Sequence, residues 1–194
     1  MSIPVHYTDL TTMTYRSLTI DESYRWHCWT PSDIAELLPV LRKYGEQCEH
    51  ITEFGVRGGC STSAWLAARP KKLVCYDIGR YPEVDEIARL AKEGGIEFEF
   101  RQENTAEATI EKTDLLFIDT VHNAYQLEHE LLFNYKGVKK FIIIHDTHTY
   151  GVIGEGGAAG LWLTILRFLI DNPSWKLLEH RPESNGLTVL QRIA

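Results

Sequence analysis

The stretch HITEFGVRGGCSTSAW, residues 50–65, decides the fold. It predicts a short buried strand over residues 51–56, then a tight turn, and then a helix from about Ser61. The turn contains three glycines, Gly55, Gly58 and Gly59. Glycine lacks a Cβ atom and tolerates positive φ, so such a turn lets the backbone approach a ligand closely. In a doubly wound sheet it would open the ligand crevice after the first strand, and the alternative is a turn that serves only as a connector.

The composition is that of a globular protein and excludes several classes. A chain of 194 residues suits one domain with a sizeable core. The net charge of −7 argues against a nucleic-acid binder that relies on a broad basic face. The sequence contains no run of 18 apolar residues, so we expect no membrane span.

The N-terminus and the cysteines indicate the compartment. Residues 1–17, MSIPVHYTDLTTMTYRS, lack the basic region and apolar core of a signal peptide. The cysteines show neither a close pair nor a metal-finger spacing. We therefore expect a reduced, cytoplasmic protein. The cysteines are Cys28, Cys48, Cys60 and Cys75.

We expect residues 1–48 to form a helical extension of the domain that spans residues 49–194. Thr30-Pro31-Ser32-Asp33 is typical of a helix start, with Thr30 as the N-cap. Apolar residues then recur at helical spacing, which predicts an amphipathic helix to about Gln47. Residues 1–25 show no clear period. The aromatic residues of this region either cover a site or pack against the domain, and they are Tyr15, Tyr24, Trp26 and Trp29.

Beyond the opening stretch, strands and helices alternate. This alternation predicts βαβ units and a parallel sheet. In the tail, residues 161–171 are apolar on nearly all sides and predict a buried helix, and Asn185-Gly186 is a hairpin signal. We therefore predict a Rossmann-like, doubly wound, mostly parallel seven-stranded sheet that ends in an antiparallel hairpin. The further strands of the main sheet are expected at residues 71–78, 96–104 (near the sheet edge), 113–120 and 139–147.

Each expected strand delivers a polar residue at its carboxyl end, where open parallel sheets bind their ligands. Asp77 lies 18 residues after Gly59, a position suited to an acid that accepts hydrogen bonds from a ribose diol. Its alternative role is that of an ordinary turn acid. The other residues at such ends are Glu53, Asn104, Asp119, His145 and Asp146.

A second cluster follows two strands that we expect to be neighbours. It consists of Asp119, His122, His145, Asp146 and His148. Carboxylates with an imidazole suit a hard or borderline divalent cation. A hydrogen-bonded network without metal is the alternative. The imidazole of His122 is placed to accept a proton from a substrate hydroxyl, although a histidine in such a loop is often structural.

The segment HTYGVIGEGGAAG, residues 148–160, has five glycines in its last ten residues. It lacks the Gly-Lys-Ser/Thr ending of a phosphate-binding P-loop, so we expect no nucleoside triphosphate here. A flexible loop beside a strand-end cluster suits a lid or substrate loop. A plain connector is the alternative.

Taken together, these motifs resemble the class I S-adenosylmethionine-dependent methyltransferases. EFGVRGGCST is similar to their first motif, YDI to the acidic second motif, and RQEN to the segment after the third strand. FIDTVHNAY and IIIHDTHTYG resemble motifs of the divalent-metal-dependent small-molecule O-methyltransferases, most closely the cephalosporin-biosynthesis and sugar O-methyltransferase-like branch. The resemblance runs from about residue 50 to the end.

This resemblance implies roles for individual residues. Glu53, Gly55 and Gly59, with Ser61 and Asp119, would line the cofactor. Asp77 would hold the ribose hydroxyls, and Asn104 would face the adenine. Asp119, His145 and Asp146 fall at the metal-ligand positions, and His122 falls where the catechol type keeps a general-base lysine. Arg57 departs from the family at a position often held by glycine, and His145 departs where a carboxylate is usual.

The resemblance therefore implies an O-methyltransferase that uses S-adenosylmethionine, and a divalent metal such as Mg²⁺ or Mn²⁺. Asp119 and His122 would be its catalytic residues. The acceptor would be a small molecule with hydroxyl groups, a sugar or another polyhydroxylated compound, with no nucleic-acid or membrane partner. Three alternatives stay open: a metal-free methyltransferase, a nicotinamide-dependent oxidoreductase and a non-catalytic cofactor-binding protein. A homo-oligomer that buries the aromatic N-terminal region is compatible with the sequence.

Overall fold

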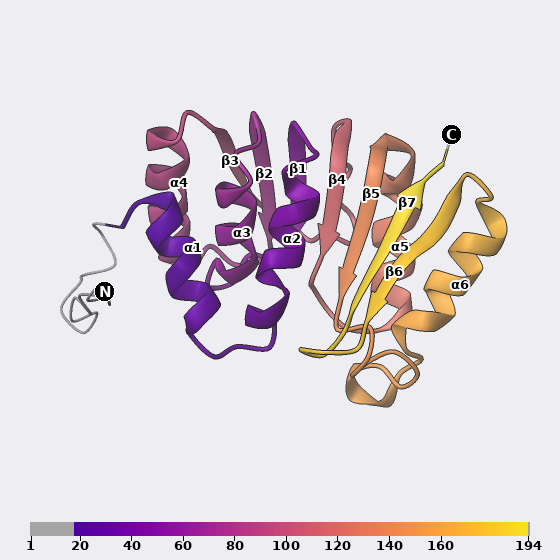
Figure 1. Cartoon of the computed structure of the whole chain (residues 1–194). Helices are drawn as coiled ribbons and strands as arrows, with labels where there is room; N and C mark the ends of the chain where they lie inside the picture. The colour runs from indigo at the N-terminus through magenta and orange to yellow at the C-terminus, as the bar shows by residue number, and fades with distance from the viewer. Residues whose placement is uncertain (1–17, 194) are drawn as a thin grey trace, which may run out of the picture.

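The computed structural model describes residues 18–193 and contains one seven-stranded sheet. The strand order is β3-β2-β1-β4-β5-β7-β6 (Figure 1). Strands β1 to β5 are parallel, whereas β7 is antiparallel to both β5 and β6. The strands are β1 (His50–Phe54), β2 (Lys72–Asp77), β3 (Glu97–Gln102), β4 (Thr113–Ile118), β5 (Val138–His145), β6 (Trp175–Arg181) and β7 (Leu187–Arg192). The predicted fold is thus confirmed, including the hairpin and the edge position of β3.

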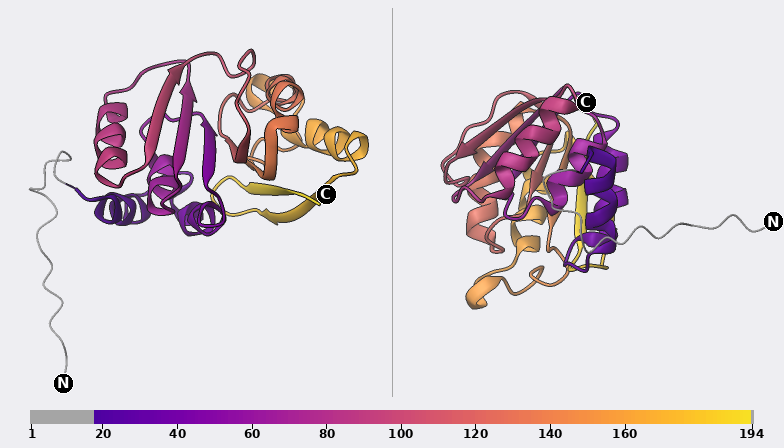
Figure 2. Two further views of the ribbon diagram at one scale, coloured as in Figure 1. Left: turned by 90° about the horizontal axis from the view of Figure 1, so that it is seen from above. Right: turned by 90° about the vertical axis from the view of Figure 1, so that its left-hand side faces the viewer.

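Helices cover both faces of the sheet, which gives three layers (Figure 2). One face packs against α1, α2, α3 and α4, and the opposite face packs against α5 and α6. The α-helices are α1 (Ile20–Trp29), α2 (Leu38–Gly45), α3 (Cys60–Ala67), α4 (Glu83–Glu93), α5 (Ala124–Asn134) and α6 (Leu161–Asp171). Residues 18–193 also contain three short 3₁₀ helices: η3 (Ala35–Leu37), η4 (Tyr135–Gly137) and η5 (Glu155–Gly157).

The central strands are apolar at consecutive positions because both of their faces are buried. Leu115 and Phe117 of β4 belong to the core under α1 to α4, whereas Leu116 and Ile118 belong to the core under α5 and α6. The order of the strands reverses between β1 and β4, since the chain proceeds from β1 toward β3 on one side and from β4 toward β5 on the other. This reversal creates a crevice beyond the carboxyl ends of β1 and β4.

The predicted start of the first helix is wrong. Thr30 does not begin a helix but ends α1, and its backbone N–H donates to the carbonyl oxygen of Trp26 at 2.9 Å. A different helix, α1, precedes Thr30 and begins at Ile20, with Thr19 as its N-cap in a capping box with Glu22. This box satisfies N–H groups that the first turn leaves unpaired, and its Thr-x-x-Glu spacing is visible in the sequence. The next α-helix, α2, begins only at Leu38.

The prediction of a fully buried α6 is also wrong. Leu161, Thr164, Ile165 and Phe168 are buried, but Leu163, Leu166 and Ile170 are 42%, 54% and 79% exposed. The helix lies toward the end of the sheet, where one side is covered and the other faces outward (Figure 1). Apolar residues around a helix therefore do not prove burial when it lies near an edge.

Several expectations concern the ends of the chain or the cysteines. Tyr15 and the stretch that lacks signal-peptide features lie outside the described residues. Within residues 18–193, none of the helices has the length and apolar character needed to cross a membrane. All four cysteines are free thiols.

Candidate functional site

A cavity of about 670 Å³ lies at the carboxyl ends of β1 and β4, where the strand order reverses. Its volume falls within the roughly 300–1,000 Å³ of small-molecule sites. Most of the wall comes from the β1–α3 turn, the β4–α5 loop, and the end of α1 with the chain that follows it, and the start of α4 and the end of β5 add one residue each. The lining residues are Trp26, His27, Thr30, Ser32, Asp33, Ile34, Gly55, Val56, Arg57, Gly58, Cys60, Ser61, Glu83, Asp119, Thr120, His122 and Asp146.

The glycine-rich turn packs directly on the end of β4. Gly55 has φ of +88°, and a Cβ atom there would lie 1.8 Å from the carbonyl oxygen of Asp119. Gly59, with φ of +76°, is the N-cap residue of α3. Only glycine combines this left-handed backbone with so close an approach. Of these two glycines, Gly55 lines the cavity and Gly59 does not.

Glu53 lies beneath α3 rather than on the cavity, which corrects the role expected for it. Its carboxylate is fully buried. Burial raises the pKa of Glu53 to about 7, although its hydrogen-bond donors oppose this shift. These donors hold the start of α3 to β1 and β2, so Glu53 organises the turn from behind. They are Ser61 Oγ at 2.6 Å, Thr62 Oγ1 at 2.7 Å, Trp65 Nε1 at 3.1 Å and Cys75 Sγ at 3.2 Å.

Asp77 fastens the same turn from the neighbouring strand. Its Oδ2 accepts hydrogen bonds from the backbone N–H groups of Val56 at 2.9 Å and Arg57 at 3.0 Å. Its Oδ1 accepts from Gly79 N–H at 2.9 Å. Asp77 is absent from the lining of the cavity. The structure therefore gives Asp77 a structural role and leaves its expected contact with a ribose as a prediction.

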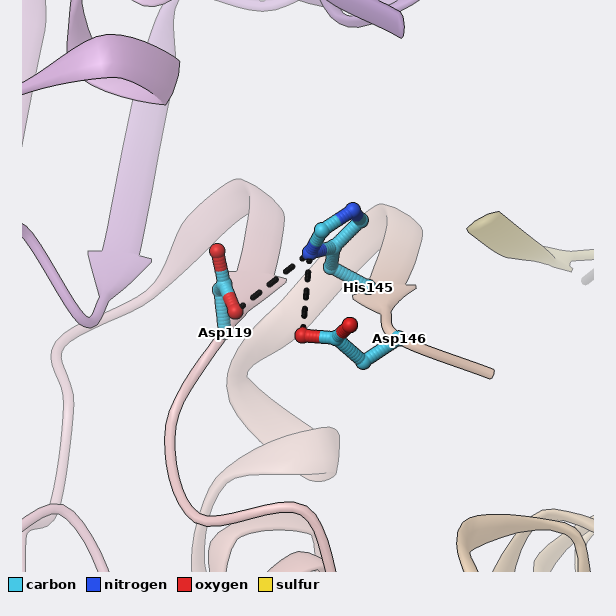
Figure 3. A group of neighbouring side chains, drawn as sticks. All are labelled: Asp119, His145 and Asp146. Carbon is cyan, nitrogen blue, oxygen red and sulfur yellow. Dashed lines mark ion pairs between the residues drawn. The ribbon is translucent and has the colours of Figure 1, made fainter. Parts of the chain in front are cut away.

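Asp119, His145 and Asp146 converge at the other side of the cavity (Figure 3). Asp119 follows β4 directly, His145 ends β5 and Asp146 comes next. Each residue offers one ligand atom, and these atoms lie within 4.8 Å of one another. Asp146 has φ of +61°, a conformation that L residues rarely adopt and that clusters at functional sites.

The hydrogen bonding of His145 fixes which of its nitrogens faces the carboxylates. Nε2 lies 2.9 Å from the carbonyl oxygen of Ser184, which can only accept, so Nε2 carries a proton. Nδ1 lies 3.5 Å from Asp119 Oδ1 and 3.2 Å from Asp146 Oδ2. Both His145 Nδ1 and Asp146 Oδ1 are buried without a well-formed hydrogen bond. A neutral His145 would thus point a lone pair at two anions, an arrangement that requires a bound cation or an extra proton.

His122 borders the same carboxylates from the β4–α5 loop. Its Nε2 lies 2.8 Å from Asp146 Oδ2 and 3.5 Å from Asp119 Oδ1. Its ring stacks on Tyr150, with centroids 4.7 Å apart. Burial favours the neutral imidazole, but the two carboxylates outweigh it and raise the pKa of His122 to about 9. The same balance raises the pKa of His145 to about 10.

The pKa values of the two carboxylates shift in the opposite direction. Burial alone would raise the pKa values of Asp119 and Asp146, but the adjacent imidazoles lower both of them. The group therefore prefers ionised acids with positive charge between them. Oxygen and imidazole donors in this arrangement suit a divalent cation such as Mn²⁺ or Mg²⁺.

The fold that carries this cavity is known from solved proteins, although no family model and no curated protein matches the sequence. The O-methyltransferase TomG from Streptomyces achromogenes, solved with SAM, is 15% identical with a TM-score of 0.61, over 90% of this chain and 89% of TomG. The N-methyltransferase NodS from Bradyrhizobium japonicum, solved with S-adenosylhomocysteine, is 14% identical with a TM-score of 0.60, over 90% of this chain and 97% of NodS. A branched-chain polyamine synthase mutein from Thermus thermophilus, solved with 5′-methylthioadenosine, is 16% identical with a TM-score of 0.64, over 92% of this chain and 65% of the synthase.

The chain has the class I methyltransferase fold. In this methyltransferase fold, the cavity lies at the switch between β1 and β4, as predicted from the sequence. Among the residues expected to bind the cofactor, Gly55, Ser61 and Asp119 line the cavity. Asn104 does not, because it is exposed and its side chain bonds to Glu107 and to the N–H of Ala106.

The residues expected to hold a metal, Asp119, His145 and Asp146, come together as predicted, whereas His148 is exposed and does not belong to the group. The glycine-rich loop after β5 approaches the cluster through another residue. Glu155 accepts a hydrogen bond from the N–H of His122 at 3.3 Å. This contact fits a substrate loop as well as a connector, so both interpretations of the loop stand.

A buried acid behind the cavity was not predicted from the sequence. Glu130 of α5 is fully buried, and its Oε1 accepts hydrogen bonds from Thr105 Oγ1 at 2.6 Å, Thr120 Oγ1 at 2.7 Å and Gln126 Nε2 at 2.8 Å. Thr120 directly follows Asp119, so Glu130 anchors the loop that carries Asp119. The sequence does contain a signal for this burial. Glu130 lies three residues after Leu127 and therefore falls on the buried face of α5.

Proposed function

We propose that the protein is an S-adenosylmethionine-dependent methyltransferase that acts on a hydroxyl group of a small molecule and uses a divalent cation. One observation carries this proposal. Two carboxylates and Nδ1 of His145, whose Nε2 is bonded to a backbone carbonyl, face one another beside a cavity in a methyltransferase fold. Hydrogen bonds alone leave these buried atoms incompletely satisfied.

The residues divide the work of methyl transfer. Asp119, His145 and Asp146 would hold the cation, which would polarise the acceptor oxygen as a Lewis acid. The glycine-rich turn would place the sulfonium so that its methyl carbon lies in line with that oxygen. His122 Nε2 faces the same two carboxylates. A cation bound to these carboxylates would offset their charge and favour the neutral imidazole, which would then take the hydroxyl proton as the new O–C bond forms and the C–S bond breaks. An acceptor with adjacent hydroxyls, such as a sugar, would fill two coordination positions.

A thermal-shift titration tests the cofactor first. S-Adenosylhomocysteine at a hundredfold excess over its Kd should stabilise the protein by about 2.7 kcal/mol, because it binds only the folded state. NAD⁺ serves as the matched nucleotide control. A shift with NAD⁺ and none with S-adenosylhomocysteine would reject the methyltransferase in favour of an oxidoreductase.

The metal is tested separately, with Mn²⁺ and Mg²⁺ added to the S-adenosylhomocysteine complex and then removed with chelator. A further shift that the chelator reverses supports the cation site. Acceptors are then screened with radiolabelled S-adenosylmethionine against polyhydroxylated compounds. Full turnover in excess chelator would select a metal-free methyltransferase, with Asp119, His145 and Asp146 as a hydrogen-bonded network only.

A further inference from the structure

Arg57 is the one lysine or arginine among the described residues that line the cavity. The other ionised side chains of the wall are mostly acids, and they are Asp33, Glu83, Asp119 and Asp146. An anionic group that entered this cavity would therefore find one guanidinium. Arginine binds carboxylates strongly, since its planar fork donates two parallel hydrogen bonds.

The backbone of Arg57 adopts a conformation that is unfavourable for a residue with a side chain. Its φ is +45°, in the left-handed region that favours glycine, and its neighbours Gly58 and Gly59 show that this turn readily uses glycine. Asp77 holds the strained turn by accepting the N–H of Arg57. An arginine at a position suited to glycine indicates a use for the side chain.

The side chain of Arg57 has no ion pair within residues 18–193. Arg69 makes the contrast clear. It follows the opposite end of α3, also has positive φ, at +58°, and pairs with Asp21 at 3.2 Å. Arg69 therefore forms a surface ion pair, whereas Arg57 is exposed and lines the cavity.

We propose that Arg57 binds the carboxylate of the methionine part of the cofactor, an inference that rests on the proposed function. The reacting methyl must lie near Asp119 and His122, and only a short methylene chain joins the sulfonium to the carboxylate. The β1–α3 turn is the element that packs on Asp119, as the close approach of Gly55 shows. Arg57 lies two residues along this turn, within reach of that end of the cofactor. The arginine thereby selects ligands that keep the carboxylate.

Isothermal titration of two ligands tests this assignment without any acceptor. S-Adenosylhomocysteine carries the carboxylate, whereas its decarboxylated derivative keeps the amine and differs only in that group. R57G and R57Q should bind S-adenosylhomocysteine roughly 10- to 100-fold more weakly and bind the decarboxylated ligand as the unsubstituted protein does. R57K keeps a positive charge and should lose less.

R69G is the matched control, because it makes the same exchange at the other end of α3 and away from the cavity. Its affinity for both ligands should be unchanged, and melting temperatures of all variants check that they fold. Undiminished binding of S-adenosylhomocysteine by R57G and R57Q overturns the inference alone and redirects the arginine to an anionic acceptor. Equal losses for both ligands also overturn it, since the turn rather than the carboxylate would then be affected. Failure of the unsubstituted protein to bind either ligand overturns the proposed function together with the inference.

Discussion

The two sides of the cavity use buried carboxylates in different ways. Beneath the glycine-rich turn, Glu53 and Asp77 accept hydrogen bonds from hydroxyl, indole, thiol and backbone donors. Across the cavity, Asp119 and Asp146 face two imidazoles, and Asp146 Oδ1 is left without a hydrogen bond. The first pair is complete and holds the structure in place. The second pair is incomplete and can take a ligand.

Removal of Glu53 should give the largest change in stability. Glu53→Ala would leave four buried donors without their acceptor. Each lost partner carries a desolvation cost, so we expect the free energy of unfolding to fall on the order of 4 kcal/mol. Urea denaturation measures it, with the exposed Glu128→Ala as control. A loss no larger than that of the control would show that Glu53 is not structural.

Removal of a carboxylate on the other side should change metal binding more than stability. Asp146→Asn replaces a charged ligand, and the affinity for Mn²⁺ should fall by at least about 100-fold. Electron paramagnetic resonance of free Mn²⁺ measures the affinity. Asp33→Asn, an acid on the same cavity but outside the group, is the control. If both variants bind Mn²⁺ equally, the acidity of the cavity binds the metal and the group does not.

The contrast also predicts a pH dependence that belongs to Glu53. Its pKa is raised from 4.5 to about 7 in the folded state, so the folded state holds the proton more tightly than the unfolded chain. The resulting stability is complete below about pH 4.5 and is lost as the pH rises through about 7. Glu53→Gln does not titrate. The difference in unfolding free energy between the unsubstituted protein and Glu53→Gln should therefore fall by about 2 kcal/mol from pH 5 to pH 7. A difference that is flat with pH would mean that Glu53 stays ionised.

The smallest effect concerns the anchor behind the cluster. Thr105→Val and Thr120→Val each remove one hydroxyl from Glu130 Oε1, and each should cost about 1 kcal/mol of stability. Only Thr120 adjoins a metal residue, so only Thr120→Val should also weaken Mn²⁺ binding, by about 10-fold. Equal Mn²⁺ affinities of the two variants would contradict the role of Thr120 in positioning Asp119.

The sheet and the convergence of Asp119, His145 and Asp146 could be predicted from local patterns. Apolar runs such as FIIIH mark strands buried on both faces, and parallel neighbouring strands bring their carboxyl ends together. Asp119, His145 and Asp146 therefore converge without any knowledge of the loops. The same rule misplaced His148, because the chain has already turned away from the sheet there.

The side of the cavity formed by the glycine-rich turn was harder to predict because its residues depend on contacts distant in sequence. Strand alternation places Glu53 on the same face as Ile51, under the helices, and this signal was available. The use of Asp77 by the turn depends on how β1 and β2 pair, which the 18-residue spacing does not show. The helix α1 was missed because its capping box precedes a segment with weak apolar periodicity, although the aromatic residues of this region were expected either to cover a site or to pack against the domain.

The close approach of Gly55 to Asp119 has a consequence for protein engineering. The backbone of Asp119 occupies the space that a side chain at position 55 would need, so there is no room for even one methyl group. A graft that transplants the glycine-rich turn from another enzyme must therefore bring the matching end of β4 with it. The glycine-rich turn and the end of β4 therefore form one module, and libraries that vary the two loops together should yield more folded clones than libraries that vary either loop alone.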